Sequence, residues 1–279
     1  MPNLFSQDYL LRLCKKYGLA PSKRYGQNYL IDAGVIETIV AASGVKSSDT
    51  IVEVGPGFGV LTLALAEHAK KVVSFEIEKK LQPYWAEVVK KQTNIEIVWG
   101  NVLRSFAPPA TPYKVVANLP YQITSPVIRL FLETEKPPAL MMLMVQKEVA
   151  ERICAEPGQM SLLSVAVQYY ADADIVATVP RSAFWPQPRV DSAVVRITNH
   201  ESRIMNPDES AKFFALVKAG FANRRKLLMK NLLPVVGKKN RVALTNIFTR
   251  LELGPNARAQ ELSVERWVEL TKVVAFLSE

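Results

Sequence analysis

Short segments rich in valine and isoleucine alternate with segments of helical periodicity from Thr50 onward. The first five predict strand, helix, strand, helix and strand, at residues 50–55, 60–70, 71–78, 80–92 and 95–100. The alternation continues with strand, helix, strand and helix at residues 113–120, 125–133, 139–146 and 147–156. Strands that alternate with helices are typical of a parallel sheet, so the pattern predicts an α/β fold.

The alternation ends with a segment that closes the sheet. Residues 162–180 and 192–199 predict a helix and strands that could close it antiparallel. The proline-rich residues 180–190 between them predict an ordered loop or extended segment, because proline does not fit a helix interior.

A polar link at residues 199–207 ends the strand character of the chain. Every later pattern is helical, at residues 208–234, 240–253 and 263–279, and Ser263 is placed as an N-cap. The sequence therefore predicts two domains, a large one at residues 1–200 and a small helical one at residues 207–279.

Composition sets limits on the class of protein. The chain has 279 residues, of which 49% are hydrophobic and 22% charged, enough to bury a core. The longest nearly apolar run, residues 137–145, is far shorter than the roughly 20 residues of a membrane-spanning helix. Cys14 and Cys154 are the two cysteines, and their separation suggests neither a disulfide framework nor a metal site. The opening residues lack the features of a secretory signal, so we expect a cytoplasmic protein. Because the cysteines suggest no metal site, we also expect no bound metal.

The net charge of +9 favours a polyanionic partner, because lysine and arginine displace counterions from phosphates. Charge alone does not identify that partner, since many basic proteins bind no nucleic acid. The positions of the basic residues along the chain are needed to decide whether the partner is a nucleic acid.

Three glycines follow the first predicted strand. Gly55, Gly57 and Gly59 lie between that strand and a helix, where glycine permits a tight turn and the close approach of a ligand. Val60 stands where a nicotinamide-binding fingerprint would need its third glycine, so a dinucleotide site fits poorly. The segment instead resembles motif I of class I methyltransferases. Glu76 ends the next strand, where its carboxylate can accept hydrogen bonds from both ribose hydroxyls of a nucleoside.

Asn101 follows the third predicted strand, at a position where the related enzymes usually carry an aspartate that accepts from the adenine amino group. An asparagine keeps a carbonyl acceptor but loses the negative charge, so cofactor affinity could be lower. The alternative is that Asn101 only shapes a turn.

The segment Asn118-Leu119-Pro120-Tyr121 ends the strand at 113–120 and resembles motif IV of adenine N6 and cytosine N4 methyltransferases. An exocyclic amine is a poor nucleophile, because its lone pair is delocalised into the ring. The Asn118 side-chain oxygen and the Leu119 or Pro120 carbonyl could accept its hydrogens and localise the lone pair. Tyr121 could stack on an extruded adenine. The alternative is a strand followed by a proline turn with a packed tyrosine.

Seven segments, taken in chain order, resemble the ribosomal RNA adenine dimethyltransferases of KsgA type. They are residues 26–32, 53–62, 75–78, 100–103, 118–128, 144–153 and 184–195. Residues 220–232 and 261–270 extend the resemblance through the helical domain. It implies a Rossmann-like class I methyltransferase sheet, S-adenosylmethionine as methyl donor, and dimethylation of two adjacent adenines in a hairpin loop of small-subunit ribosomal RNA, coupled to ribosome biogenesis.

The resemblance also assigns residues that the local pattern does not. Asn28 and Leu30 would border the cofactor together with Gly55, Glu76, Asn101 and Asn118, although locally residues 26–32 could be only the lead-in to a helix capped by Asp32. Phe184, otherwise a core residue, would provide a second aromatic face for the target adenine.

Basic residues gather near the start of the helical domain, where phosphate contact is the natural interpretation. They are Arg224, Arg225, Lys226 and Lys230, followed by Lys238, Lys239 and Arg241. The alternative is a solvated helix face. The expected partner is small-subunit ribosomal RNA or a pre-ribosomal particle, and we expect a monomer that does not bind a membrane.

Other functions remain open at the level of sequence. One is an Erm-type methyltransferase of large-subunit RNA, against which the helical-domain motifs argue. Another is a ribosome-assembly factor with weak catalysis, which is kept as an alternative because Asn101 replaces the usual aspartate. A DNA adenine methylase would also need an NLPY-like site, whereas a nicotinamide enzyme would leave that segment without a purpose.

Overall fold

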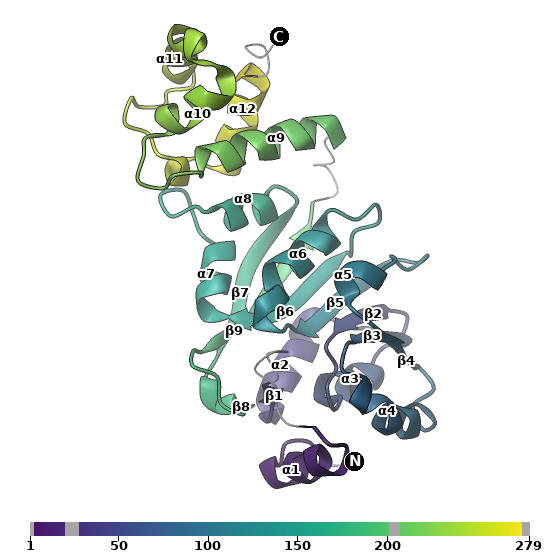
Figure 1. Cartoon of the computed structure of the whole chain (residues 1–279). Coiled ribbons are helices and arrows are strands. Elements are labelled where there is room, and N and C mark those ends of the chain that lie inside the picture. The colour runs from purple at the N-terminus through teal and green to yellow at the C-terminus, as the bar shows by residue number, and fades with distance from the viewer. Residues whose placement is uncertain (1–2, 20–27, 201–206, 275–279) are drawn as a thin grey trace. The chain divides into compact units, whose positions relative to one another are not determined.

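The computed structural model of the chain describes residues 3–19, 28–200 and 207–274, and it consists of two compact units (Figure 1). One unit comprises Met1–Ala150 and Asp172–Asn199, and the other comprises Glu151–Ala171 and His200–Glu279. The first contains the sheet, and the second is helical.

The sheet follows from the predicted strands. They are β2 (Thr50–Val54), β3 (Lys71–Glu76), β4 (Ile95–Trp99), β5 (Tyr113–Asn118), β6 (Leu140–Gln146), β7 (Ala171–Val179) and β9 (Ser192–Asn199). Within the described residues these seven form one sheet in the order β4-β3-β2-β5-β6-β9-β7. β2 is parallel to β3 and β5, and β9 pairs antiparallel with β6. Both the α/β class and the antiparallel closure are confirmed.

The strand order reverses at β2. The chain runs outward from β2 through β3 to β4 and then returns to β5 on the other side of β2. Right-handed crossovers therefore place the helices before and after this return on opposite faces of the sheet. A ligand is expected at the carboxyl ends of the strands beside such a switch point, which here means β2 and β5.

The helices of the first unit include α3, α4 and α6, which the sequence predicted, and also α1 and α5, which it did not. They are α1 (Gln7–Lys16), α2 (Ala33–Ser43), α3 (Val60–Ala66), α4 (Gln82–Val89), α5 (Val102–Ser105) and α6 (Thr124–Leu132), followed by α7 (Lys147–Ile153), which contains the unit boundary. Asp32 caps α2 as predicted, because its Oδ1 accepts a hydrogen bond from the Val35 amide at 3.2 Å. α2 packs against α3, and α5 packs against α6.

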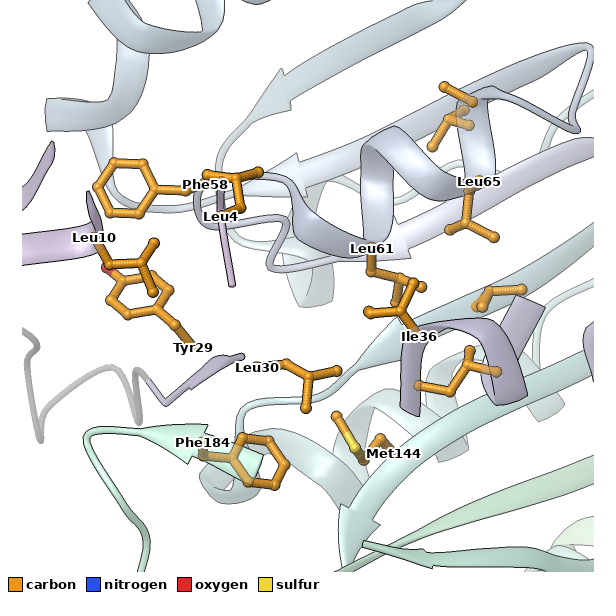
Figure 2. Packing of buried hydrophobic residues seen from close by; sticks show 14 of the residues in the cluster. Leu4, Leu10, Tyr29, Leu30, Ile36, Phe58, Leu61, Leu65, Met144 and Phe184 are labelled. Carbon is orange, nitrogen blue, oxygen red and sulfur yellow. The ribbon is translucent and has the colours of Figure 1, made fainter. Parts of the chain in front are cut away.

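Two short strands join segments that are far apart in the sequence. β1 (Tyr29–Leu30) pairs antiparallel with β8 (Phe184–Trp185), with Leu30 opposite Phe184. β8 lies within the proline-rich segment predicted as an ordered loop or extended segment, directly after a 3-10 turn at Arg181–Ala183. Figure 2 shows Leu30, Phe184 and Met144 in one buried cluster, so this pairing forms part of the core beneath the site.

The helical unit contains α8 (Leu162–Gln168), α9 (Pro207–Gly220), α10 (Leu228–Val236), α11 (Arg241–Arg250) and α12 (Val264–Val274). Ser263 caps α12, since its hydroxyl accepts a hydrogen bond from the Arg266 amide at 3.3 Å. The chain division differs from the predicted boundary near residue 200, because α8 belongs to this unit. Tyr169 explains the difference: its ring stacks on Phe213 at 4.2 Å between centroids, and its hydroxyl lies 3.1 Å from the Ser210 hydroxyl.

The continuous helical pattern predicted for residues 208–234 is interrupted. α9 ends at Gly220 and α10 begins at Leu228, so residues 221–227 form a loop. The Asn231 side chain donates hydrogen bonds to the carbonyl oxygens of Gly220, at 2.6 Å, and Asn223, at 3.0 Å. Because that side chain is buried and pairs these carbonyls, the loop replaces two further turns of helix without leaving them unsatisfied.

Two further findings concern the described residues alone. Among them no helix is long and apolar enough to cross a membrane. They also contain no group of three or more histidine, cysteine, aspartate and glutamate side chains arranged to hold a metal ion.

Candidate active site

A cavity of about 190 Å³ lies at the carboxyl ends of β2, β3 and β5. A single water needs roughly 10–15 Å³ by the same measure, so this cavity can take part of a larger ligand. Its walls contain ten of the predicted site residues: Asn28, Leu30, Gly55, Gly57, Glu76, Asn101, Asn118, Leu119, Pro120 and Tyr121. The structure thus brings together segments spread over nearly a hundred positions of the sequence.

The glycine loop after β2 forms the floor of the cavity. Gly55, Gly57 and Gly59 have positive φ angles of 76°, 55° and 86°, a region that residues with a Cβ atom rarely enter. α4 holds the loop from behind: the Trp85 indole donates a hydrogen bond to the Gly57 carbonyl at 3.0 Å, and the Tyr84 hydroxyl donates to the Phe58 carbonyl at 2.6 Å. The backbone amides and carbonyls at the cavity are therefore fixed in position.

Glu76 is 5% exposed at the end of β3. Its Oε2 accepts a hydrogen bond from the Gly57 amide at 3.1 Å, and its Oε1 accepts one from the Glu78 amide at 2.8 Å. Burial raises the pKa of the Glu76 carboxyl, although these backbone hydrogen bonds act in the opposite direction. Each carboxylate oxygen has a second lone pair, so the side chain can still accept hydrogen bonds from a diol.

Asn101 lines the cavity and also caps the short helix α5. Its Oδ1 accepts a hydrogen bond from the Leu103 amide at 3.0 Å. Asn101 therefore both shapes this turn and lines the cavity. The capping bond uses one lone pair of the amide oxygen that a ligand would also need.

Asn118 ends β5, half-buried in the cavity wall, and the next two residues differ in what they offer. The Pro120 carbonyl already accepts a hydrogen bond from the Ile123 amide at 3.0 Å. The Leu119 amide donates to the Met144 carbonyl at 3.1 Å, which fixes this peptide against β6. Of the two backbone acceptors considered from the sequence, the Leu119 carbonyl is therefore the more suitable.

Tyr121 begins the 3-10 turn η3 (Tyr121–Ile123) beside Asn118. Its hydroxyl lies 2.7 Å from that of Ser192, which is fully buried at the start of β9. Burial raises the pKa of the Tyr121 phenol, so the group stays protonated at neutral pH. This hydrogen bond fixes the ring in the cavity wall and connects it to the segment that follows Phe184.

Phe184 is the one predicted catalytic residue that the cavity wall does not include. The residue is 2% exposed and packs in the core with Leu30 and Met144 (Figure 2). In this structure it supports β1 and does not face the cavity. A role as a second aromatic face for the adenine stays a prediction, and it would require the ring to turn out of the core.

Several cavity residues carried no predicted role. Glu53 and Tyr29 lie within motifs that were identified, and Ile77 directly follows Glu76 with 47% of its side chain exposed. An exposed isoleucine at the end of a buried strand is a signal that could have been noticed. Leu4 and Leu10, at the N-terminal helix, are buried at the cavity through tertiary packing that no sequence pattern revealed.

The four predicted RNA-contact residues lie in the helical unit. Arg224, Arg225 and Lys226 are exposed on the loop between α9 and α10, and Lys230 is exposed on α10. Their alternative role as one solvated helix face does not apply to the first three, because they are not on a helix. Asn231 holds the loop that carries them.

The strand order and the cavity at its switch point are those of class I methyltransferases. The structure resembles a dimethyladenosine transferase from Plasmodium falciparum with a TM-score of 0.76 and 26% identity, covering 86% of this chain and 95% of that one. It also resembles the 23S rRNA methyltransferase ErmE with a TM-score of 0.72 and 26% identity, covering 88% and 99%. Within this class, the chain belongs to the ribosomal RNA adenine dimethylase family, whose model matches residues 19–275.

Curated relatives match nearly the whole chain. A ribosomal RNA small subunit methyltransferase A from Dehalococcoides mccartyi is 41% identical over 280 aligned positions, which cover 98% of this chain and 94% of that protein. Proteins of the same name from Geobacillus thermodenitrificans and Enterococcus faecalis are each 38% identical. These alignments cover 93% and 94% of this chain, and 92% and 93% of the relatives.

Proposed function

We propose that this protein uses S-adenosylmethionine to dimethylate N6 of two adjacent adenines in a hairpin loop of small-subunit ribosomal RNA. The proposal rests mainly on one observation: Asn118 and the Leu119 peptide line the same cavity as Glu76. Amine acceptors and a nucleoside-binding carboxylate are thus next to each other, as transfer from a nucleoside cofactor to an exocyclic amine requires. The names of the full-length relatives support the small subunit as the source of the RNA.

The cavity residues suit S-adenosylmethionine. The buried Glu76 carboxylate would accept hydrogen bonds from the ribose hydroxyls, and Asn101 would meet the adenine. Asn28 and Leu30 border the same space, and Ile77 adds apolar surface for the base. Gly55 and Gly57 line the cavity without side chains, so a ligand can approach the backbone of the loop closely. A Cβ atom at Gly57 would in addition lie only 3.3 Å from the Tyr29 ring. The cofactor supplies an activated methyl group, so no metal is needed for the transfer.

Asn118 and Leu119 would prepare the target amine. The Asn118 side-chain oxygen accepts one N6 hydrogen and the Leu119 carbonyl accepts the other, which localises the nitrogen lone pair for in-line attack. Pro120 keeps the backbone of this segment rigid. Tyr121, fixed by Ser192, would stack on the extruded base and hold it in the reactive orientation.

The RNA would be held by its phosphates in the helical unit. Arg224, Arg225, Lys226 and Lys230 provide exposed positive charge for this contact. Hairpin-loop bases suit such an enzyme, because unpaired bases can be turned out and stacked. We further propose that the protein acts as a cytoplasmic monomer on naked RNA or a pre-ribosomal particle, and that its domains serve cofactor binding and RNA contact respectively.

Asn101 favours a second candidate function, a ribosome-assembly factor that binds pre-ribosomal RNA with weak catalysis. Its amide lacks the charge of the aspartate usual in the related enzymes, and its oxygen is already engaged in capping. An Erm-type activity is a weaker alternative. The likeness to ErmE is in fold, at 26% identity, whereas the small-subunit relatives reach 41% over nearly the full length.

Transfer of labelled methyl from S-adenosylmethionine tests these functions directly. The substrates are unmethylated small subunits, naked small-subunit RNA, large-subunit RNA and duplex DNA, with nucleoside analysis of the products. We expect N6,N6-dimethyladenosine from small-subunit RNA or particles. Dimethylation of large-subunit RNA alone would support the Erm-type function, and cofactor binding without product on any substrate would support the assembly factor.

Replacing Asn118 with alanine tests the mechanism. We expect Asn118→Ala to lower the rate of transfer by roughly a hundredfold or more, comparable to the loss of a catalytic hydrogen-bonding group, because an acceptor for the amine is lost. Asn246→Ala, at an exposed position of α11, is the matched control and should keep wild-type activity. A folded Asn118→Ala protein with full activity would refute the proposed role.

A further inference from the structure

Ser192 is a buried polar residue at the edge of the sheet where the cavity lies. It begins β9 and is fully buried, and its partner in the antiparallel register is Gln146, the last residue of β6. Asn118 ends the neighbouring strand β5 opposite Met144, so Ser192 and Asn118 lie at the same edge of the sheet. The Ser192 hydroxyl is 2.7 Å from the hydroxyl of Tyr121, which lines the cavity.

The backbone that carries Ser192 is held on two sides. The carbonyl of the preceding Asp191 accepts a hydrogen bond from the Lys147 amide at 3.0 Å. The Asp191 side chain accepts another from the Arg181 amide at 2.9 Å, and Arg181 begins the turn that leads into β8. The position of the Ser192 hydroxyl is therefore fixed by the segments next to β6 and β8 before any ligand enters the cavity.

The half-buried Tyr121 ring has few other constraints. Within the described part of the chain, the Ser192 hydroxyl is the hydrogen-bond partner of the Tyr121 side chain, and no other aromatic ring packs against it. A hydrogen bond at the far end of the ring restricts both side-chain torsions to one orientation. Without this bond the ring would stay in the cavity wall, but its orientation would be less well defined.

The two transfers of the proposed reaction differ in how the amine is held. In the first, Asn118 and the Leu119 carbonyl accept the two N6 hydrogens. The nitrogen lone pair forms a bond to the methyl carbon, the carbon–sulfur bond breaks, the sulfur keeps the electron pair, and one N6 proton leaves to solvent. The second transfer repeats these steps on an amine with one methyl and one hydrogen, so at most one of the two acceptors is used. The orientation of the base then depends more on its stacking against Tyr121.

We propose that Ser192 is a positioning residue for the second methyl transfer. Through its hydrogen bond it holds the Tyr121 ring in the orientation in which the monomethylated adenine stacks with its amine towards the methyl donor. The first transfer depends less on this bond, because two acceptors also orient the amine. The inference rests on the proposed function, since it assumes that N6 of adenine receives two methyl groups.

Single-turnover transfer to unmethylated small subunits tests the proposal, with N6-methyladenosine and N6,N6-dimethyladenosine quantified over time. We expect Ser192→Ala to slow the second transfer by roughly tenfold and the first by less than about threefold, so that N6-methyladenosine accumulates. Tyr121→Phe keeps a stacking ring but removes the same hydrogen bond from its other end, and it should give the same product ratio. This second variant also tests the proposal if Ser192→Ala does not fold.

A double variant and a control separate positioning from a general loss of structure. If Ser192 acts through Tyr121, the combination of Ser192→Ala with Tyr121→Phe should be no slower in the second transfer than Tyr121→Phe alone. Ser43→Ala is the matched control, because the Ser43 hydroxyl is also buried and donates to the Val40 carbonyl at 2.7 Å within α2, away from the cavity wall. It should keep wild-type rates for both transfers.

The possible failures are distinguishable. If the wild-type protein forms neither product from small subunits, the proposed function is wrong and the inference fails with it. If the wild-type protein dimethylates and both single variants match its two rates, the role of Ser192 is refuted while the function stands. Equal slowing of the two transfers, or effects that add in the double variant, would also overturn the proposal, because Ser192 would then support the cavity without acting through Tyr121.

Discussion

Among the described residues, the side chain of Asn101 has one hydrogen-bond partner before any ligand enters. Its Oδ1 caps α5 by accepting from the Leu103 amide, and the other branch of the side-chain amide is an NH₂ group, which can only donate. An aspartate at this position would offer a second oxygen in place of that donor. The hydrogen bond from an adenine amino group would then be charge-assisted, and such bonds are the stronger ones.

We therefore expect Asn101→Asp to bind S-adenosylmethionine roughly fivefold more tightly, a gain of about 1 kcal/mol from a charged acceptor. Calorimetric titration measures this, and Asn246→Asp on the surface of α11 controls for added charge. An unchanged or weaker affinity would show that the Asn101 side chain serves α5 and not the adenine. A tighter cofactor without faster transfer would strengthen the case for an assembly factor.

Sequence reasoning found site residues where chemistry requires a particular residue type at a strand end. Asn118, Glu76, Gly55 and Gly57 belong to this group, and all four line the cavity. Glu53 was seen in its motif but given no role, because only the structure shows that it lies in the cavity wall and that its hydrogen-bond donors are the hydroxyls of Thr62 and Ser74. Leu10 was missed because an apolar residue on a helix is equally compatible with any core.

The glycine loop and α4 behave as one element. Trp85 donates its indole hydrogen bond to the Gly57 carbonyl, and its ring lies where a Cβ atom at Gly59 would come within 2.7 Å. The loop can therefore approach α4 this closely only without a side chain at Gly59. That packing fixes the loop against a buried tryptophan, away from the ligand side.

Gly59→Ala should lower the free energy of unfolding by roughly 2–4 kcal/mol, combining a strained backbone with an overpacked Trp85. Gly44→Ala is the matched control, because Gly44 also has a positive φ, 52°, but no atom within 4 Å of an added Cβ. It should cost only the backbone part, roughly 1–2 kcal/mol. If urea denaturation shows equal losses of unfolding free energy for the two variants, the Trp85 ring moves aside without an energetic penalty.

The predicted elements agree with the structure where periodicity was regular, as in β2 to β6 and in α3, α4 and α6. The two-residue strands β1 and β8 have too few residues to show a period, and their pairing depends on Tyr29 meeting Trp185 from a distant part of the sequence. The loop at 221–227 was hidden because its apolar residues continue the helical pattern of α9. Its cause is the side chain of Asn231, which pairs backbone groups eight and eleven positions away.

For the molecule as a whole, the net charge of +9 favours a polyanionic partner. The exposed basic residues of the 221–227 loop are where this expectation can be tested. Arg224 and Arg225 are carried on a loop that Asn231 holds in shape, so their charges are presented from a defined backbone. Such residues would contribute to RNA affinity through counterion release, without affecting the cofactor cavity.

Arg224→Ala and Arg225→Ala together should weaken RNA binding and reduce the slope of log affinity against log salt by roughly 1.4–1.8, if each contacts one phosphate. Filter binding at several salt concentrations measures the slope. Lys90→Ala with Lys91→Ala, an exposed basic pair after α4, is the matched control. An unaltered slope would mean that the arginines face solvent, and cofactor affinity should not change in either variant.

The division of the chain between the two units matters for anyone who wishes to cut it or exchange its parts. α8 lies between β6 and β7 in sequence, yet its Val165 and the following Tyr169 complete the core of the helical unit. A fragment that starts at residue 207 would expose the apolar surface that these residues cover. A chimaera that borrows the helical unit from a relative must therefore carry residues 151–171 as well, as two separate grafts into one gene.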